Sequence, residues 1–164
     1  MRMVLKNTTT YLSPMIKNNK IEYTSKEYLE FKDLTDQIEE QVKESGVKNG
    51  YVLVFSQHTT LAVCINEKES GIVKDFKSLM SKLIPKDVYY CHNDLTIRTE
   101  NLVCQSAKSD CLNGHSHCTH MLMPNSEMIP IIDGKMALGT WQKIFTIELD
   151  CERKRTVIVQ ISGE

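Results

Sequence analysis

The stretch Met128-Ile129-Pro130-Ile131-Ile132-Asp133-Gly134-Lys135-Met136-Ala137-Leu138 decides the fold class of this chain. Two apolar runs flank an Asp-Gly pair, which is a strong hairpin signal because both residues of such a tight turn adopt positive φ. Strands joined by so short a turn must be antiparallel, whereas parallel strands need a crossover connection of a dozen residues or more. The stretch therefore predicts a hairpin within an antiparallel sheet.

Other segments on both sides of this hairpin have strand character. Residues 51–55 are a continuous apolar run, the pattern of a strand that is covered on both faces. A polar turn is expected at residues 17–20, and a charged turn precedes the last strand. The remaining predicted strands are residues 3–11, 21–23, 59–65, 144–149 and 156–161.

Two helices are expected between these strands. The first begins at the capping box Thr24-Ser25-Lys26-Glu27 and ends near Gly46. Its apolar stripe, at spacings of three and four, is Tyr28, Phe31, Leu34, Ile38 and Val42. The second runs from about Glu69 to Leu83, and its expected buried side is Ile72, Val73, Phe76, Leu79, Met80 and Leu83. About seven strands and two interleaved helices predict one α+β domain over residues 1–164, built on antiparallel sheets.

The composition excludes several classes of protein. A chain of 164 residues suits a single domain. Its 20 Lys and Arg nearly balance 21 Asp and Glu, so no basic surplus indicates a nucleic-acid partner, and Arg153-Lys154-Arg155 is interpreted as a solvated turn. No apolar stretch is long enough to span a membrane. Six cysteines without an export signal at the N-terminus indicate reduced thiols and a cytoplasmic protein.

All five histidines lie between residues 58 and 120, and three of them fall within Gly114–His120. Neutral imidazole is the commonest metal ligand. On a strand, His115 and His117 would point to one face and His120 to the other. A His-x-His pair is also a frequent polar surface feature. A structural zinc site at Cys111, His115, His117 and Cys118 is disfavoured because such sites normally carry a Cys-x2–4-Cys pair.

Two more polar clusters are candidates for a site. Gln57-His58-Thr59-Thr60 ends an apolar strand, from which side chains project into a cleft. Glu67 and Asp75 add carboxylates near the start of the second helix, where acids also serve merely to complement the helix dipole. A tryptophan at the start of a strand is most often part of the core, and Trp141, the only tryptophan, fits that interpretation. Its polar neighbour Gln142 suits ligand binding instead.

In this combination and order, the clusters resemble the YjbQ-like family, which is described as secondary thiamine-phosphate synthase. The match covers nearly the whole chain, and Gly-Thr-Trp-Gln following His-Thr-Thr at this separation is quite specific. The matching residues are Gln57–Thr60, Asn66-Glu67, His92, Ser116-His117, Pro130, Asp133-Gly134, Gly139–Gln142 and Gly163-Glu164.

The resemblance implies a two-sheet antiparallel β-sandwich with two helices, assembled as a homotrimer. It also implies one site, with His58, His92 and His117 as metal ligands. The residues expected to act beside the metal are Glu67, Asp75, Trp141 and Gln142. His115 and His120 are not part of the pattern. The chain departs from the family by an apparent insertion around residues 96–112 and by Cys118, where an apolar residue is usual.

The implied reaction joins an aminopyrimidine methyl diphosphate to a thiazole phosphate and expels pyrophosphate. A divalent metal would clamp the leaving oxygens, and three imidazoles leave coordination positions open. The expected cofactor is zinc or another transition metal, or magnesium with a diphosphate substrate. Two alternatives stay open: a metal-dependent phosphohydrolase, in which water is the nucleophile, and a non-catalytic protein that binds a metal or ligand.

Overall fold

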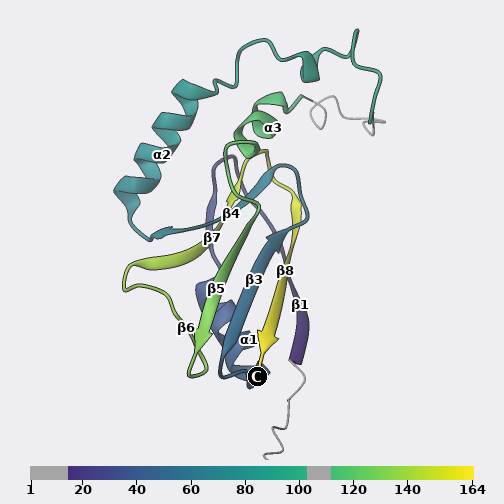
Figure 1. Cartoon of the computed structure of the whole chain (residues 1–164). Coiled ribbons are helices and arrows are strands. Elements are labelled where there is room, and N and C mark those ends of the chain that lie inside the picture. The colour runs from purple at the N-terminus through teal and green to yellow at the C-terminus, as the bar shows by residue number, and fades with distance from the viewer. Residues whose placement is uncertain (1–14, 103–111) are drawn as a thin grey trace, which may run out of the picture.

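The computed structural model describes residues 15–102 and 112–164 and arranges their strands in two antiparallel sheets (Figure 1). The larger sheet has the order β1-β8-β3-β5-β6 and the smaller one the order β2-β7-β4. The strands are β1 (Met15–Thr24), β2 (Phe31–Asp33), β3 (Gly50–Ser56), β4 (Leu61–Glu67), β5 (Ser126–Ile132), β6 (Lys135–Met136), β7 (Gln142–Glu148) and β8 (Lys154–Gly163). The helices are α1 (Thr35–Ser45), α2 (Ser70–Leu83) and α3 (Gly114–His120), with a 3₁₀ turn η1 (Cys91–Asn93). The predicted α+β fold with two antiparallel sheets is confirmed.

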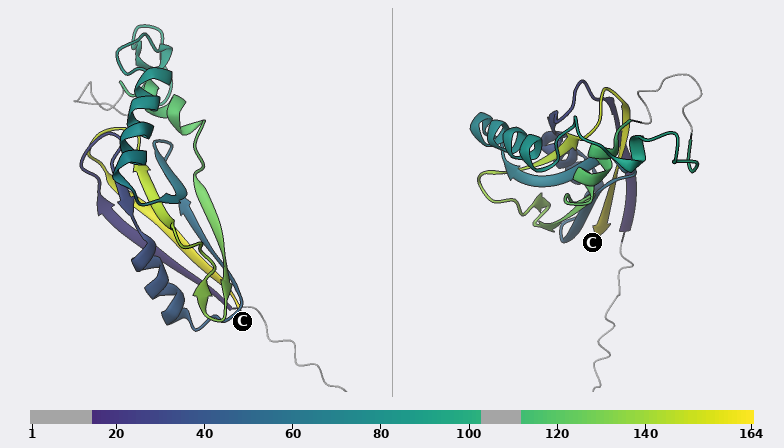
Figure 2. Two further views of the ribbon diagram at one scale, coloured as in Figure 1. Left: turned by 90° about the vertical axis from the view of Figure 1, so that its left-hand side faces the viewer. Right: turned by 90° about the horizontal axis from the view of Figure 1, so that it is seen from above.

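The main apolar core lies between the two sheets. Alternate residues of β3 and β8 point inward, such as Val52 and Val159, each fully buried. Helix α1 contributes Ile38 to the same core. On the other side of the smaller sheet, Met80 of α2 packs with Ile147 of β7, so α2 lies against its outer face (Figure 2).

The predicted start of the first helix is wrong. The box at residues 24–27 does not cap a helix, because the Ser25 hydroxyl donates to the carbonyl of Arg153 at 3.2 Å. Residues 31–33 pair with β7 instead, and α1 begins where Asp33 Oδ1 accepts from the Thr35 amide at 2.9 Å. Strand pairing outweighs the helical spacing in the first half of the stripe.

The N-terminal expectations need one further correction. The polar residues 17–20 do not turn but continue β1, which pairs with β8 along its whole length. Their polarity reflects an edge strand whose side chains are mostly exposed. The strand expected at residues 3–11 lies outside the described residues.

Helix α2 has the predicted length, but its apolar side is mostly uncovered. The Glu69 carboxylate accepts from the amides of Gly71 and Ile72 and so caps its start. Of the side expected to be buried, only Met80 is, whereas Leu79 is 56% exposed. The helix stands at the rim of the molecule, where the small sheet is too narrow to cover it (Figure 1).

The three clustered histidines lie on α3 and not on a strand. Residues two apart on a helix point in nearly opposite directions, so His115 and His117 do not share a face. His115 is buried at 2% exposure, and His117 is only half-buried. Most of the apparent insertion, residues 103–111, lies outside the described residues.

The hairpin that decided the fold class is present. Asp133 and Gly134 have φ of 51° and 79°, and Ile132 pairs with Lys135. Replacing Gly134 by Val is therefore expected to lower the free energy of unfolding by about 1 kcal/mol or more, because a β-branched residue resists positive φ. The added Cβ would meet nothing closer than 3.5 Å, so the effect is backbone strain. Chemical denaturation measures it, with Lys135→Val as the control at an ordinary strand position; equal midpoints for Gly134→Val and the wild type would refute the turn geometry.

Candidate functional site

Two loops meet at one end of the sandwich. Strand β3 ends where β8 begins, since Ser56 pairs with Val157, and β4 begins where β7 ends, since Leu61 pairs with Glu148. The β3–β4 and β7–β8 loops therefore lie together, and α3 joins them through Asn113, which precedes it. Between them is a polar cavity of about 680 Å³, which we call the loop cavity. Its walls include Gln57, His58, Thr59, His117, Asp150 and Lys154.

A buried ion pair lies beneath this cavity. Arg155 and Glu148 are 3% and 1% exposed, and Arg155 Nε donates to Glu148 Oε2 at 2.6 Å. Arg155 Nη2 contacts Glu148 Oε1 and also donates to Thr60 Oγ1 at 3.0 Å. The interpretation of residues 153–155 as a solvated turn is thus wrong for Arg155, because strand alternation turns its side chain inward.

A second ion pair links α3 to the β7–β8 loop. Asp150 Oδ2 accepts from Arg153 Nε and from Asn113 Nδ2, each at 2.8 Å. Asn113 and Asp150 are 6% and 7% exposed, so this contact holds the start of α3 against the loop. Both arginines of the cavity are therefore paired with acids, while Lys154 is exposed beside them.

His58 lies in the loop cavity with one ring nitrogen already engaged. Its Nε2 accepts from the backbone amide of Thr156 at 2.9 Å. Burial, and secondarily the Arg155 guanidinium, lower the pKa of His58. The imidazole is therefore neutral at neutral pH, with its proton on Nδ1.

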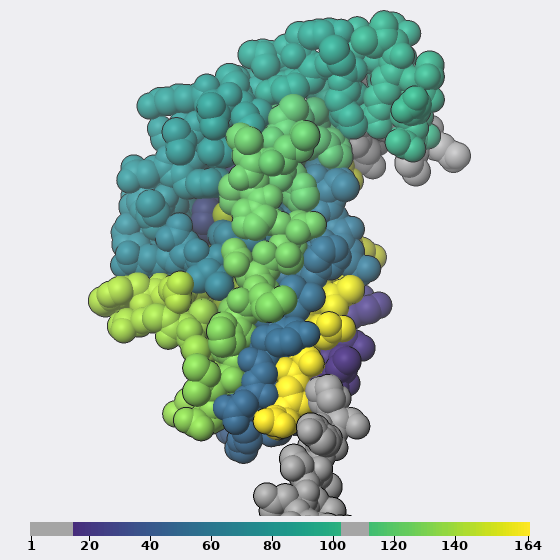
Figure 3. Space-filling view, viewed as in Figure 1, coloured from purple at the N-terminus to yellow at the C-terminus, as the bar shows by residue number. Residues whose placement is uncertain are grey.

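His92 on η1 and His117 on α3 form a pair, and His117 lines the loop cavity. The segment of η1 lies next to α3 (Figure 3). Their ring centroids are 4.5 Å apart. His92 Nε2 lies 3.1 Å from Asn113 Oδ1 and 3.0 Å from Arg98 Nη1, so these two side chains orient the ring. Arg98 Nη1 also donates to the His92 carbonyl at 3.0 Å. Nδ1 is the ring nitrogen of His92 that lies outside these contacts.

The other predicted site residues lie elsewhere in the chain. Glu67 and Asp75 line a mainly apolar cavity of about 380 Å³ between β4 and α2. Gln142 pairs with Glu67 across β4 and β7, and its Oε1 accepts from the Gly139 amide at 2.7 Å. Trp141 is 71% exposed, so it is not a core residue. Within this chain, the predicted site divides into a histidine half and a carboxylate half that do not share a cavity.

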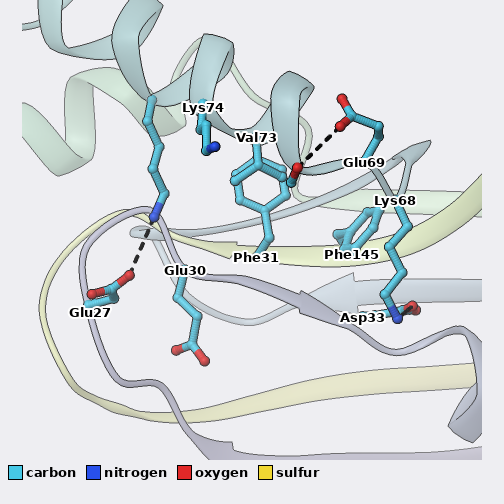
Figure 4. A pocket seen from close by; sticks show the side chains of 11 residues that line it. Glu27, Glu30, Phe31, Asp33, Lys68, Glu69, Val73, Lys74 and Phe145 are labelled. Carbon is cyan, nitrogen blue, oxygen red and sulfur yellow. Dashed lines mark hydrogen bonds and ion pairs between the residues drawn. The ribbon is translucent and has the colours of Figure 1, made fainter.

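A further cavity, of about 570 Å³, lies between β2 and α2 (Figure 4). Phe31, Val73 and Phe145 line it, and charged residues surround them. Two of its lysines are paired, Lys68 with Asp33 at 2.9 Å and Lys77 with Glu27 at 3.3 Å. None of the predicted site residues lines this cavity, which leaves the loop cavity as the candidate for polar chemistry.

The donor set fits a divalent metal only in part. In residues 15–102 and 112–164, no three His, Cys, Asp or Glu side chains are grouped closely enough to hold an ion. His92 and His117 fit as two ligands, because their rings lie together and the contacts of His92 Nε2 orient its ring with Nδ1 as the nitrogen that could bind an ion. His58 does not fit, because its unprotonated nitrogen already accepts the Thr156 amide.

Sequence reasoning missed the four residues that build the cavity: Asn113, Glu148, Asp150 and Arg155. A signal for three of them was present. Two acids, Glu148 and Asp150, precede a turn between two predicted strands, and two arginines, Arg153 and Arg155, follow it. Residues on either side of such a turn face each other across the strands, so these opposite charges are expected to pair. Asn113 carries no such signal, because its role depends on where α3 packs.

The histidines predict how stability depends on pH. Burial lowers the pKa of His58, His115, His117 and His120 in the folded protein. As the pH falls below the unfolded value of about 6.5, the unfolded chain binds protons first, so stability is full above that pH and is lost below it. Urea midpoints from about pH 7.5 to about pH 5.5 should fall, and His115→Gln should reduce the slope. A midpoint that does not change over this range would contradict the expectation.

Comparison with known proteins agrees with this fold. Residues 19–164 match the model of the family described as UPF0047 protein YjbQ-like. A UPF0047 protein from Methanothermobacter thermautotrophicus is 36% identical over 136 residues, which cover 83% of this chain and 85% of that protein. The crystal structure of a YbjQ-like protein of unknown function from Sulfolobus solfataricus has a TM-score of 0.80 at 31% identity and covers 93% of this chain and 100% of that one.

A protein from Thermus thermophilus shows the same fold at 22% identity, with a TM-score of 0.66 over 87% of this chain and 98% of that one. In the described part of the chain, no helix has the length and apolar character needed to cross a membrane. The family match extends over both sheets and includes all five histidines. This chain belongs to the YjbQ-like (UPF0047) family.

Proposed function

We propose that the loop cavity binds a small phosphorylated metabolite and that the protein is a metal-dependent enzyme acting on it, by a pyrophosphate-releasing transfer of the thiamine-phosphate synthase kind. The observation that carries the proposal is the make-up of this cavity. Its walls carry the amide of Gln57, the hydroxyl of Thr59 and the ammonium group of Lys154. These are the groups that bind phosphate oxygens in proteins.

Two charged residues of the loop cavity, Lys154 and Glu152, stand outside the ion pairs of its arginines. Arg153 and Arg155 are paired with Asp150 and Glu148, so these four residues contribute little net charge. Lys154 is exposed at the mouth of the cavity and supplies the cation for a phosphate. Of the two carboxylates that line the cavity, Asp150 is paired with Arg153, so Glu152, exposed on the same loop, is the one that would accept a proton.

His92 and His117 are the residues that would hold a divalent ion. Two imidazoles leave most of the coordination shell open, and diphosphate oxygens complete such a shell in many phosphate enzymes. A metal bound there would stabilise the negative charge that develops on a departing pyrophosphate. Asn113 and Asp150 support the pair from behind by fixing the ring of His92.

We also propose a cytoplasmic homotrimer. Over β3 and β5, the outer face of the five-stranded sheet carries uncovered apolar side chains, with Tyr51, Met128 and Ile132 exposed at 38%, 61% and 56%. The sequence pattern of β3, apolar on both faces, fits a strand that a second chain covers. The thiols of Cys64, Cys91 and Cys118 form no disulfide, which suits a reducing compartment. Light scattering on a sizing column should give three times the chain mass at micromolar concentration, and a monomer would refute this assembly.

One observation favours the alternative of a non-catalytic binding protein. Glu67 and Asp75, the acids expected beside the metal, line a different cavity from the histidines. A binding protein needs the phosphate donors of the loop cavity but no acid aimed at the reacting atoms. The phosphohydrolase alternative differs from the transferase only in using water as the nucleophile.

A turnover assay separates these functions. The wild type is incubated with Mg²⁺ or Zn²⁺ and a panel of alkyl diphosphates and phosphate monoesters, and release of pyrophosphate or phosphate is followed. Lys154→Ala is expected to lose on the order of tenfold or more in kcat/KM, since it removes a charged hydrogen bond. Lys74→Ala, in the cavity between β2 and α2, is the matched control. Binding of these compounds without any turnover would leave the binding-protein alternative in place of the enzyme.

A further inference from the structure

We propose that His58 is a fixed hydrogen-bond donor to an anionic oxygen of the ligand, through its Nδ1–H, and is not a metal ligand. The inference rests on the proposed function of the loop cavity and deepens it, since it assigns one of the phosphate contacts. It departs from the three-histidine metal site that the family resemblance implies.

His58 is held at the end of β3 by a hydrogen bond from the Thr156 amide. The ladder between β3 and β8 stops at Ser56 and Val157, and the chain then leaves the sheet. The next amide of β8, that of Thr156, would lack a backbone acceptor on this side. His58 Nε2 takes that position at 2.9 Å. An amide N–H only donates, so Nε2 must carry the lone pair and the proton of the neutral ring must be on Nδ1.

His58 cannot act as a metal ligand in this arrangement. A metal at Nε2 would displace the Thr156 amide and leave a backbone donor without its partner. A metal at Nδ1 would have to displace the proton of a ring whose other nitrogen is already hydrogen-bonded. His92 differs, because its Nε2 contacts the side chains of Asn113 and Arg98 and not a backbone amide.

The β3–β4 loop, which carries His58, is held in place by buried hydrogen bonds. The loop that follows His58 is held by Arg155, whose Nη2 donates to both the carbonyl and the hydroxyl of Thr60, at 3.3 Å and 3.0 Å. The Leu149 amide donates to the same carbonyl at 3.0 Å. Since Arg155 is itself fixed by Glu148, the β3–β4 loop cannot move away from β8 without breaking buried bonds.

The other ring nitrogen of His58, Nδ1, is available to a ligand. His58 is half-buried and lines the loop cavity with Thr59 and Lys154. In the described ranges no protein group bonds Nδ1, and this atom is not among the buried polar atoms that lack a partner. Nδ1–H is therefore open to the cavity. A histidine that only satisfied the last amide of a strand would need the acceptor at Nε2 and nothing more. An exposed Nδ1–H, in a cavity that Lys154 also lines, suits an anion site.

Nuclear magnetic resonance of the histidine rings tests the tautomer directly. Long-range proton–nitrogen spectra of the nitrogen-labelled full-length protein should show His58 protonated on Nδ1 and bare on Nε2. Pyrophosphate should shift Nδ1–H, and Zn²⁺ should shift the ring nitrogens of His92 and His117 while the tautomer of His58 stays unchanged. Protonation on Nε2 in the free protein, or a Zn²⁺-bound His58 nitrogen, would overturn the inference.

Three substitutions of His58 separate its role as a hydrogen-bond donor through Nδ1 from its role as the acceptor for the Thr156 amide. His58→Asn keeps an amide near the place of Nδ1, and His58→Gln places its amide near Nε2. Pyrophosphate affinity, measured by calorimetry, should fall on the order of tenfold or more in His58→Gln and His58→Ala but less in His58→Asn. His120→Ala, outside the loop cavity, is the control. Equal losses in all three His58 variants would refute the donor role.

The outcomes also separate this inference from the proposed function. If the wild type binds no pyrophosphate or phosphate ester, the proposed function fails, and the donor role fails with it even when the tautomer is as expected. If the wild type binds pyrophosphate but all His58 variants bind it equally well, only the role of His58 is wrong.

Discussion

Replacing Glu148 by Ala is expected to lower the free energy of unfolding by about 3–5 kcal/mol, a larger loss than any other single substitution at the loop cavity should cause. The change leaves the Arg155 guanidinium buried at 3% exposure without its carboxylate. An unpaired buried charge is far more destabilising than the loss of a surface contact. The Asp150 amide, which donates to Glu148 Oε1 at 2.9 Å, loses its acceptor as well.

Urea denaturation followed by circular dichroism measures this effect. Glu152→Ala, four residues along and exposed, is the matched control and should stay within about 0.5 kcal/mol of the wild type. The double variant Glu148→Leu/Arg155→Met removes both charges and should recover much of the loss. If Glu148→Ala were as stable as the control, the pair would not hold the floor of the cavity.

Replacing His117 by Ala is expected to weaken Zn²⁺ binding on the order of 100-fold or more, because one of two protein ligands is lost. His92→Ala should have a similar effect, since the two rings are 4.5 Å apart. His58→Ala should change the affinity by only a few-fold. Competition with a chromogenic chelator measures each dissociation constant.

His115→Ala and His120→Ala are the controls for this series. His115 is buried beside Tyr28 and Tyr90, and neither histidine lines the loop cavity. Both variants should therefore keep the metal. If His58→Ala lost the metal as completely as His117→Ala, the site would have the three ligands that the family resemblance implies, and His58 would not be the hydrogen-bond donor that we propose.

The sequence predicted most strands of the two sheets, because local signals determine them. Asp133-Gly134 demands a tight turn, and the alternation of β8 places one face inside. It was insufficient at residues 24–33, where the spacing suits a helix but pairing with β7 decides the outcome. Nothing in the segment itself shows that a partner strand is available, because β7 lies more than a hundred residues away along the chain.

The candidate site was predictable only in its residue types. Histidines were singled out from the sequence, and the structure brings His92 and His117 together although residues 103–111 intervene. The tautomer of His58 was out of reach, because it depends on the Thr156 amide, a contact that forms only in the folded chain. The burial of Arg155 was missed because a charged run next to a turn is usually solvated.

Chemical-shift mapping with pyrophosphate tests the central claim most directly. On addition of pyrophosphate with Mg²⁺ to the labelled protein, we expect shifts of the amides of residues 57–60, of Asn113 and of Lys154, together with the His58 ring. These residues surround the loop cavity. Shifts confined to Glu67, Asp75 and the start of α2, or no shifts at millimolar pyrophosphate, would contradict it.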